Sequence, residues 1–471
     1  MLFNSVEFIF LFLPITWVVY FGLIKQRKIF IAKAWLVGAS LFFYAYWNLN
    51  YLPLLLLSIM VNFSTGSALT LSHKNSLLSP WKKLIATFGV SFNLLLLGYY
   101  KYTDFLFDNF NTLGFDLTLP RIILPLGISF FTFTQIAFLV DSYRGKAKEY
   151  SLLNYMLFVT YFPHLLAGPI LHHKDMMPQF ANSWNWVVRW KNVAIGLFIF
   201  SVGLFKKVII ADYFAPIADK GFANPDILNA IEAWGASLAY TMQLYFDFSG
   251  YCDMAIGASL LFNIRLPINF NSPYKALNIQ DFWRRWHITL GAFLRDYVYI
   301  PLGGSRVQNS RVYFNLIVTF FLGGLWHGAG WTFVFWGLLH GLALAIHRWW
   351  STLGIALPKA AAWLLTFLFV HLSWVFFRAE DLPKALAMLK NMFWGNLPSG
   401  NLSAWLIHLE TKPKFLLFLV IALLVVRLLP NSNRIPDYFK PNTLFGIIFV
   451  ILMFICITNL NHHQAFLYFN F

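Results

Sequence analysis

The chain has 471 residues, of which 59% are hydrophobic, 20% are aromatic and only 11% are charged. An ordinary soluble domain carries about 25% charged residues, so this composition excludes a soluble globular protein and indicates a chain embedded in a lipid bilayer. The net charge of +16 fits basic cytoplasmic loops and contact with anionic membrane lipids, and it gives no reason to expect nucleic acid as a partner. No hydrophilic stretch is long enough to fold separately, so we expect one all-α, membrane-embedded domain over residues 1–471.

Apolar stretches follow one another along most of the chain. A membrane-spanning helix needs about 20 apolar residues. The first stretch lacks a preceding basic segment and a small-residue cleavage site, so we expect a retained span and not a removed signal peptide. Because some stretches are short or hold polar groups, we expect about ten to twelve crossings together with re-entrant or interfacial helices. The candidate stretches are 6–24, 29–47, 51–71, 84–100, 121–140, 152–171, 193–211, 232–248, 312–326, 331–347, 360–377, 413–429 and 443–460.

Charges between the first spans predict the orientation of the chain. The loops after the first, third and fifth stretches are basic, whereas the loops between them carry no charge or more acidic than basic residues. Basic loops face the cytoplasm, so the N-terminus is expected on the opposite side. The basic loop residues include Lys25, Arg27, Lys28, Lys33, Lys82, Lys83, Arg144, Lys146 and Lys148.

Polar residues interrupt the apolar pattern near residue 248. Gln243, Asp247 and Asp253 lie in or beside an apolar stretch, and carboxylates at membrane depth need partners. We rate a buried ion pair that orders the fold above a binding role, because ion pairing alone explains such groups. The basic residues that could supply the partners are Arg284, Arg285 and Arg295.

The segment 263–311 is too polar to span a bilayer and too apolar to be a solvated loop. Non-spanning backbone is tolerated at membrane depth only where protein buries it or where it lines a wet cavity. On one helix, Trp283 and His287 would share a face. For the cluster 283–287, an interfacial helix with tryptophans at headgroup level and arginines on lipid phosphate is an equally good explanation. This cluster, the densest of the segment, is Trp283-Arg284-Arg285-Trp286-His287.

A second cluster, residues 323–331, places Trp326 and His327 among glycines. Ionisable residues within a membrane are costly and often functional, and glycines let a helix or a ligand approach closely. The structural alternative is a helix break packed against its neighbour, with His327 hydrogen-bonded to a carbonyl. Both explanations stay open on this cluster alone.

Other motifs give no sign of a nucleotide or metal site. The sequence has no Walker loop, no GxSxG elbow and no HExxH motif. Cys252 and Cys456 have no neighbours at metal-ligand spacing, so we expect no bound metal. His340, His347 and His371 lie in apolar segments and are expected to be core or interface residues.

Several ordered motifs, taken together, resemble the membrane-bound O-acyltransferases, and in particular the bacterial branch of alginate and peptidoglycan O-acetylation proteins. The resemblance covers most of the chain, with its core motifs in residues 240–345. The opening residues 1–5 and the loop 162–170 are also similar to that branch. The core motifs are residues 246–251 (FDFSGY), 282–287 (FWRRWH), 295–297 (RDY), 299–304 (YIPLGG) and 325–328 (LWHG).

The resemblance implies a funnel-shaped helical core with an active centre inside a bacterial inner membrane. The N-terminus, which the basic loops put outside, would then lie on the periplasmic side. The family's invariant histidine matches His327, and its second polar position matches His287. The implied reaction moves an acyl group, by expectation acetyl, from a cytoplasmic thioester to a hydroxyl for O-acetylation of an extracytoplasmic polysaccharide. The donor is acetyl-CoA or an acyl-carrier thioester, no cofactor is bound, and a periplasmic acetyltransferase partner is expected to complete the transfer.

Our hypothesis gives each candidate residue a role. His327 is the general base, because neutral imidazole is available near pH 7, and His287 orients the reactants or stabilises the developing oxyanion. Asp247 and Gln243 are candidates for donor or substrate binding. The arginines expected to attract a phosphate-bearing donor are Arg284, Arg285 and Arg295. The tryptophans expected to wall the site and limit hydrolysis are Trp283, Trp286 and Trp326.

Two other classes of function remain open from the residues alone. Broken helices and intramembrane charges also suit a transporter that moves an activated acyl group or a glycan without transferase chemistry. A scaffold for a cell-envelope complex is the weaker alternative, and it would tolerate conservative changes of the histidines. The sequence does not choose among polysaccharides, donors or oligomeric states.

Overall fold

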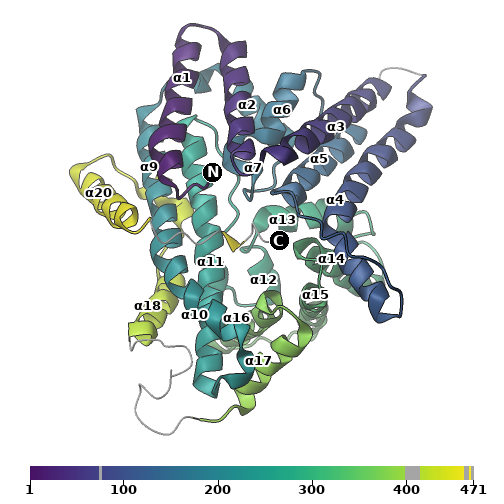
Figure 1. Cartoon of the computed structure of the whole chain (residues 1–471), viewed down its shortest axis with the longest axis vertical. Helices are drawn as coiled ribbons and strands as arrows, with labels where there is room; N and C mark the ends of the chain where they lie inside the picture. Colours follow the sequence, from purple (N-terminus) through teal and green to yellow (C-terminus); the bar gives the residue numbers. More distant parts are fainter. Residues whose placement is uncertain (74–76, 398–413, 461–465, 468–471) are drawn as a thin grey trace. The chain divides into compact units, whose positions relative to one another are not determined.

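A computed structural model describes residues 1–73, 77–397, 414–460 and 466–467 (Figure 1). Every regular element among these residues is helical, which confirms the expected all-α class. The α-helices of the first half are α1 Leu13–Lys25, α2 Ile29–Ala45, α3 Leu52–Ser72, α4 Lys82–Thr112, α5 Ile128–Tyr143, α6 Leu152–Thr160, α7 Phe162–Leu165, α8 His173–Ala181, α9 Trp190–Phe205 and α10 Asp212–Ala223. Those of the second half are α11 Ala230–Leu261, α12 Ile279–Trp283, α13 Ile288–Leu294, α14 Asn309–His327, α15 Trp331–Thr352, α16 Lys359–Arg378, α17 Leu382–Trp394, α18 Lys414–Leu428, α19 Ile435–Tyr438 and α20 Thr443–Thr458.

The chain divides into two compact units. The helices α9, α11 and α20 contribute residues to both. The expectation of a single membrane-embedded domain over residues 1–471 stays a prediction. Unit 1 comprises Met1–Ser201, Tyr251–Pro267 and Phe439–Phe449, and unit 2 comprises Val202–Gly250, Ile268–Tyr438 and Val450–Phe471.

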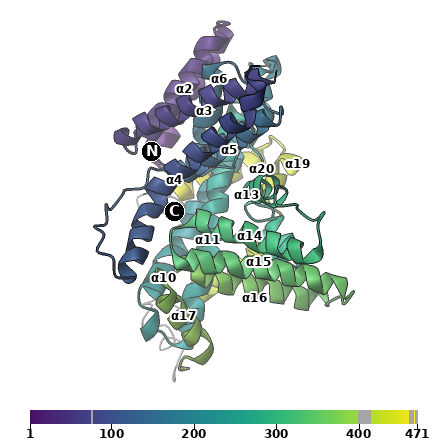
Figure 2. The ribbon, with the colours of Figure 1, turned by 90° about the vertical axis from the view of Figure 1, so that its right-hand side faces the viewer.

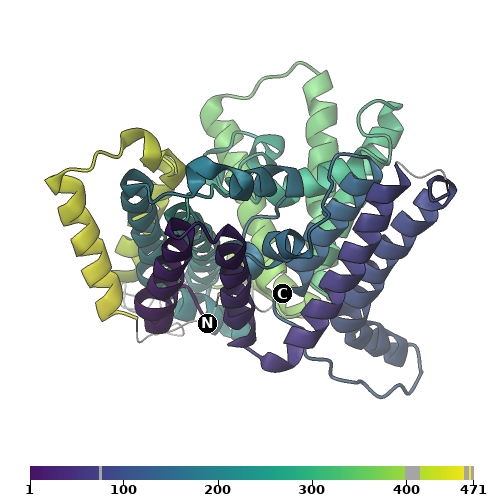
Figure 3. The same ribbon diagram turned by 90° about the horizontal axis from the view of Figure 1, so that it is seen from above.

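In unit 1, α1 lies beside α2, and α3, α4 and α5 pack against one another (Figures 1 and 3). Buried aromatic rings fill the space near the N-terminus: the ring centroids of Phe8 and Phe43 lie 5.8 Å apart, and those of Phe12 and Phe162 lie 5.1 Å apart. Such pairs add about 0.5–1.5 kcal/mol each beyond the area they bury. Aromatic contacts therefore contribute to the core near the N-terminus.

In unit 2, α15 packs against both α14 and α16 (Figure 2). Gly324 of α14 and Gly337 of α15 allow the close approach, because a Cβ added at Gly324 would lie 2.9 Å from the Gly337 Cα and would overlap the carbonyl oxygen of Phe333. Small residues at a helix crossing let two backbones meet. This contact fixes the end of α14, where His327 is the last helical residue.

Five helical segments among the described residues are long and apolar enough to cross a membrane, and a bent pair near the C-terminus would make a sixth. Two further apolar helices are shorter, α2 and α20. The expected polytopic architecture is confirmed, but the number of such helices is below the expected about ten to twelve crossings. The five segments are Phe8–Lys25, Leu49–Ser72, Ser79–Thr112, Trp190–Ala223 and Lys359–Arg378, and the bent pair is Lys414–Leu428 with Ser432–Tyr438.

Breaks in the expected stretches explain part of this difference. The stretch 152–171 is divided between α6 and α7 at Tyr161, because Pro163 has no N–H to continue a helix and is accepted only in a first helical turn. In the stretch 121–140 the helix begins only at Ile128, after a left-handed Gly127. Residue 413, where another stretch was expected to begin, lies outside the described residues.

Candidate active site

His287 lies in the break between α12 and α13. Its backbone has φ 44° and ψ 53°, in the left-handed region that favours glycine, and a side chain there costs about 1–2 kcal/mol. The predicted shared helix face of Trp283 and His287 is therefore wrong: α12 ends at Trp283, and a left-handed residue cannot continue a right-handed helix. Backbone outliers of this kind cluster at functional sites.

Asn269 holds this turn in place. Its side-chain Oδ1 accepts hydrogen bonds from the backbone N–H of Thr289 at 3.2 Å and from the Thr289 hydroxyl at 2.9 Å, and it lies 3.2 Å from Nδ1 of His287. The backbone carbonyl of Asn269 accepts the N–H of Ile288 at 3.0 Å. Sequence reasoning missed Asn269, because no local spacing joins it to residues 18 and 20 positions further along.

His327 lies at the C-terminal end of α14 and is only 2% exposed. Aromatic rings from the two following helices surround it: the ring centroids of Trp336 on α15 and Phe377 on α16 each lie 5.1 Å away. Both rings meet it edge-on, at interplanar angles of 88° and 74°. Neither neighbour was a predicted site residue, since each reads in sequence as an ordinary aromatic of an apolar helix.

The fold of unit 2 brings the two predicted catalytic histidines together. The ring centroids of His287 and His327 lie 6.3 Å apart. Trp326 lies beside both rings, at 6.1 Å and 4.9 Å, and Phe248 of α11 lies 4.9 Å from the ring of His287. The result is a pair of buried imidazoles in a largely aromatic environment.

Burial lowers the pKa of His287 to about 3, since a low-dielectric environment disfavours the charged imidazolium. The ring is therefore neutral throughout the physiological pH range. A neutral imidazole can accept a hydrogen bond or a proton from a hydroxyl, and a shell of aromatic rings limits the access of competing water. The arrangement is suited to proton transfer in a dry site.

The three predicted wall tryptophans differ in position. Trp326 contacts the histidine pair, as described above. Trp286 is 1% exposed and packs on Trp374 and Phe270, with ring centroids 4.9 Å and 5.0 Å away, so it belongs to the aromatic core of unit 2. Trp283 donates its Nε1–H to Nδ1 of His340 at 3.2 Å. A role for these rings in excluding water stays a prediction.

The predicted donor-binding arginines lie at or near the surface. Arg285 pairs with Asp281 at 2.8 Å, and Arg295 pairs with the adjacent Asp296 at 2.7 Å. Arg284 is exposed. Solvent-accessible guanidinium groups can meet a phosphate-bearing ligand, and two of these three would do so while already neutralised by a neighbouring carboxylate.

Asp247 pairs with Lys207, so the expected arginine partner is wrong. The Lys207 Nζ lies 2.6 Å from Asp247 and 2.8 Å from Asp212, and the backbone N–H of Leu467 donates to the other oxygen of Asp247 at 3.1 Å. The candidate arginines are far from Asp247 in the sequence, so spacing cannot show which cation pairs with it. Only the fold selects the partner. Gln243 precedes Asp247 by one turn of α11 and is 4% exposed; its proposed binding role is untested.

Two other buried histidines of unit 2 have both ring nitrogens engaged. Nε2 of His340 lies 2.9 Å from the Ser373 hydroxyl, and Nδ1 accepts from Trp283, as noted above. His371 lies between the hydroxyls of Ser237 and Thr241, at 3.1 Å and 2.8 Å. These contacts fit the core role expected for both residues.

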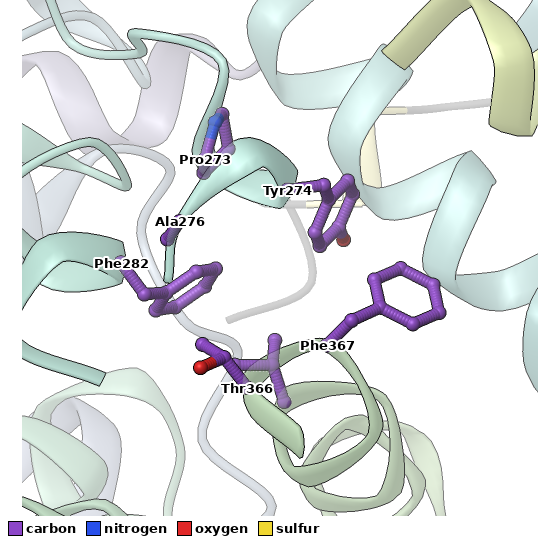
Figure 4. Close-up of a pocket in the computed structure, with 7 residues that line it drawn as sticks. Pro273, Tyr274, Ala276, Phe282, Thr366 and Phe367 are labelled. Carbon is purple, nitrogen blue, oxygen red and sulfur yellow. The ribbon is translucent and has the colours of Figure 1, made fainter. Parts of the chain in front are cut away.

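Figure 4 shows a small hollow that neither His287 nor His327 lines, and it has no room for a water molecule. Its only hydroxyl groups are engaged elsewhere: Thr366 donates to the carbonyl of Ala362 at 2.7 Å, and Tyr274 donates to that of Thr241 at 3.1 Å. We therefore regard this hollow as a packing defect of the core. Its lining residues are Pro273, Tyr274, Ala276, Phe282, Thr366, Phe367 and Val370.

Within the described ranges, no group of three or more His, Cys, Asp or Glu side chains could hold a metal ion.

Comparison with known proteins identifies the class. Residues 41–378 match the MBOAT, membrane-bound O-acyltransferase family, and this range includes both histidines of the buried pair. The chain therefore belongs to the membrane-bound O-acyltransferase family. It is a multi-pass membrane enzyme that transfers acyl groups to hydroxyls, and this membership supports transferase chemistry over the transporter and scaffold alternatives.

Individual relatives show which members of the family the chain is similar to. The chain is 48% identical to the peptidoglycan O-acetyltransferase of Helicobacter pylori, over 98% of this chain and 90% of the relative. It is 41% identical to the probable alginate O-acetylase AlgI of Pseudomonas aeruginosa, over 92% of this chain and 83% of the relative. Similarity extends at 31% identity to the teichoic acid D-alanyltransferase of Bacillus subtilis, over 43% of this chain and 53% of the relative.

Proposed function

We propose that this protein transfers an acetyl group from a cytoplasmic thioester to a hydroxyl, for O-acetylation of an extracytoplasmic polysaccharide. The hydroxyl oxygen attacks the thioester carbonyl, the hydroxyl proton passes to an imidazole, and the carbon–sulfur bond breaks. The departing sulfur then takes the proton, so the products are an acetyl ester and a free thiol. The observation that carries the proposal is the buried pair of His287 and His327, with ring centroids 6.3 Å apart.

His327 is our candidate for the general base, and His287 for the residue that orients the reactants or stabilises the oxyanion. A hydroxyl has a high pKa and attacks a thioester poorly, and a base in hydrogen-bond reach typically contributes about 10²–10⁴-fold in rate. Arg284, Arg285 and Arg295 are the candidate contacts for a phosphate-bearing donor. Trp326 is our candidate for the residue that walls the site, because it lies beside both histidine rings.

The acceptor to test first is peptidoglycan, because the relative at 48% identity acts on it; an alginate-like polymer is the second choice. We propose acetyl-CoA as the donor, with an acyl-carrier thioester as the alternative. A periplasmic acetyltransferase partner is proposed to complete transfer to the polymer. We propose that the enzyme lies in the bacterial inner membrane with its N-terminus in the periplasm, and the basic loops after the first, third and fifth apolar stretches support this orientation.

The direct test uses purified protein in lipid nanodiscs with acetyl-CoA labelled in the acetyl group. Wild type is expected to release free CoA, and His327→Ala and His287→Ala are expected to lose this activity. His347→Ala, a change outside the buried pair, serves as the matched control and should keep it. Wild-type activity in a folded His327→Ala variant would overturn the assignment. If no variant consumes acetyl-CoA, the same series is repeated with an acyl-carrier thioester.

A further inference from the structure

The hydrogen bonds around Asn269 fix which way its amide faces. The backbone N–H of Thr289 can only donate, and it points to the atom of Asn269 that also meets the Thr289 hydroxyl and Nδ1 of His287. That atom must therefore be the amide oxygen and not the amide nitrogen. An amide oxygen has no proton to give, so Nδ1 of His287 has to be the donor in the third contact.

This assignment determines the protonation of the whole ring. A neutral imidazole carries one proton, so a ring with Nδ1–H has its lone pair on Nε2. Such a ring cannot donate a hydrogen bond from Nε2 to an oxyanion. It can only accept there, from a hydroxyl or another donor.

We infer that Asn269 is a positioning residue, which holds His287 as the Nδ1–H tautomer so that Nε2 accepts the hydrogen of the acceptor hydroxyl. The inference rests on the proposed function, and it decides between the two roles left open for His287. His287 then orients the acceptor hydroxyl. It cannot donate a hydrogen bond from Nε2 to the oxyanion while the ring is neutral. Asn269 also supports the left-handed backbone of His287 through its bonds to Ile288 and Thr289.

The surroundings of His287 explain why an amide, and not a carboxylate, holds its tautomer. Of the neighbours described for the ring, His327 on α14 is the titratable one, and Phe248 on α11, Trp326 on α14 and Asn269 itself are not ionisable. On the adjoining turn, Arg284 is exposed and Arg285 is paired with Asp281. A carboxylate in place of the amide would hold the same tautomer but would also attract a second proton to Nε2, and that proton would block acceptance.

The test compares Asn269→Ala, Asn269→Asp and Thr289→Val. Asn269→Ala is expected to lower kcat by about 10²-fold, the lower end of a typical acid–base contribution, with little change in KM for the thioester. Asn269→Asp is expected to keep activity at alkaline pH and lose it as the pH falls, because the carboxylate raises the pKa of His287. Thr289→Val removes one hydroxyl donor to the same oxygen and should keep the wild-type pH profile.

A readout independent of activity is solid-state NMR of protein with isotope-labelled histidine, the His287 signals being assigned by their loss in His287→Asn. Wild type and Thr289→Val are expected to show protonated Nδ1 and unprotonated Nε2, and Asn269→Ala to show a mixture of tautomers. Protonated Nε2 in wild type would overturn the inference. So would a folded Asn269→Asp protein whose activity falls at low pH no more than that of wild type. If wild type shows the expected tautomer but consumes no thioester, the proposed function fails and the tautomer assignment stands.

Discussion

Two regions of the molecule contain paired histidines, and they surround them with different groups. In unit 1, His172 and His173 each face a carboxylate: Nδ1 of His172 lies 3.6 Å from Asp141, and Nε2 of His173 lies 3.1 Å from Glu149. In unit 2, the neighbours described for His287 and His327 are an amide oxygen, aromatic rings and each other.

The difference shows how one residue type can serve two purposes. A carboxylate beside an imidazole gives the ring a polar partner, and the contact ties two segments of the chain together. An amide and aromatic rings favour the neutral form, which keeps a nitrogen able to accept a proton. The surroundings, and not the histidines themselves, separate a structural cluster from a candidate catalytic one.

The largest expected contrast is in activity. His327→Ala should lower the rate of acetyl transfer by about 10²–10⁴-fold, because the proposed general base is lost, whereas His173→Gln should change it by less than about threefold, since glutamine can still donate to Glu149. Thioester consumption by the two purified variants checks this. Equal losses in both, with both proteins folded, would show that the comparison between the regions is wrong.

Removing the buried Lys207 cation of unit 2 should lower the stability of the fold. Lys207→Met removes the cation between Asp247 and Asp212 and leaves buried carboxylates uncompensated, so we expect a loss of about 3–5 kcal/mol in the free energy of unfolding. Denaturant unfolding in detergent measures it. Lys206→Met, a change at the adjacent and less buried lysine, is the control, and adding Asp247→Asn to Lys207→Met should recover part of the loss. Without such recovery, the ion pair would not be the source of the stability.

The histidine centre depends on backbone packing in addition to its side-chain neighbours. Gly324→Ala forces α14 and α15 apart and should cost about 1–3 kcal/mol of stability, as overpacking usually does, together with reduced activity because His327 follows by one helical turn. Gly22→Ala, on a helix where an added Cβ meets nothing within 4 Å, is the matched control. A fully active and stable Gly324→Ala protein would mean that this crossing does not set the position of His327.

The smallest effect is a pH dependence in unit 1. Burial raises the pKa of Glu149, but hydrogen bonds from His173 and from the backbone N–H of Ser151 lower it by more, and the net pKa lies below the ordinary value. Glu149 therefore stabilises the fold above its unfolded pKa of about 4.3, and this contribution is lost as the pH falls through the lower folded value. The stability difference between wild type and Glu149→Gln should be constant near neutrality and shrink in acid. Asp175→Asn, at an exposed position, should show no such trend.

Sequence reasoning found much of the candidate site but not its geometry. His287 and His327 could be named from motifs, and their pairing is a property of unit 2 that fits this prediction. The arginine partner expected for Asp247 was wrong because several cations of similar sequence distance were available, and only packing selected Lys207. The helix expected to join Trp283 to His287 was wrong because the left-handed backbone at His287 depends on bonds from residue 269.

The sequence by itself determined the membrane environment, the helical class and the set of candidate residues for the chemistry, because hydropathy and residue type are local properties. The tertiary structure alone decided which groups meet: the amide of Asn269 with His287, the rings of Trp336 and Phe377 with His327, and Lys207 with Asp247. These contacts join residues far apart in the chain, and their energies depend on distance and burial, which no local pattern of residues encodes.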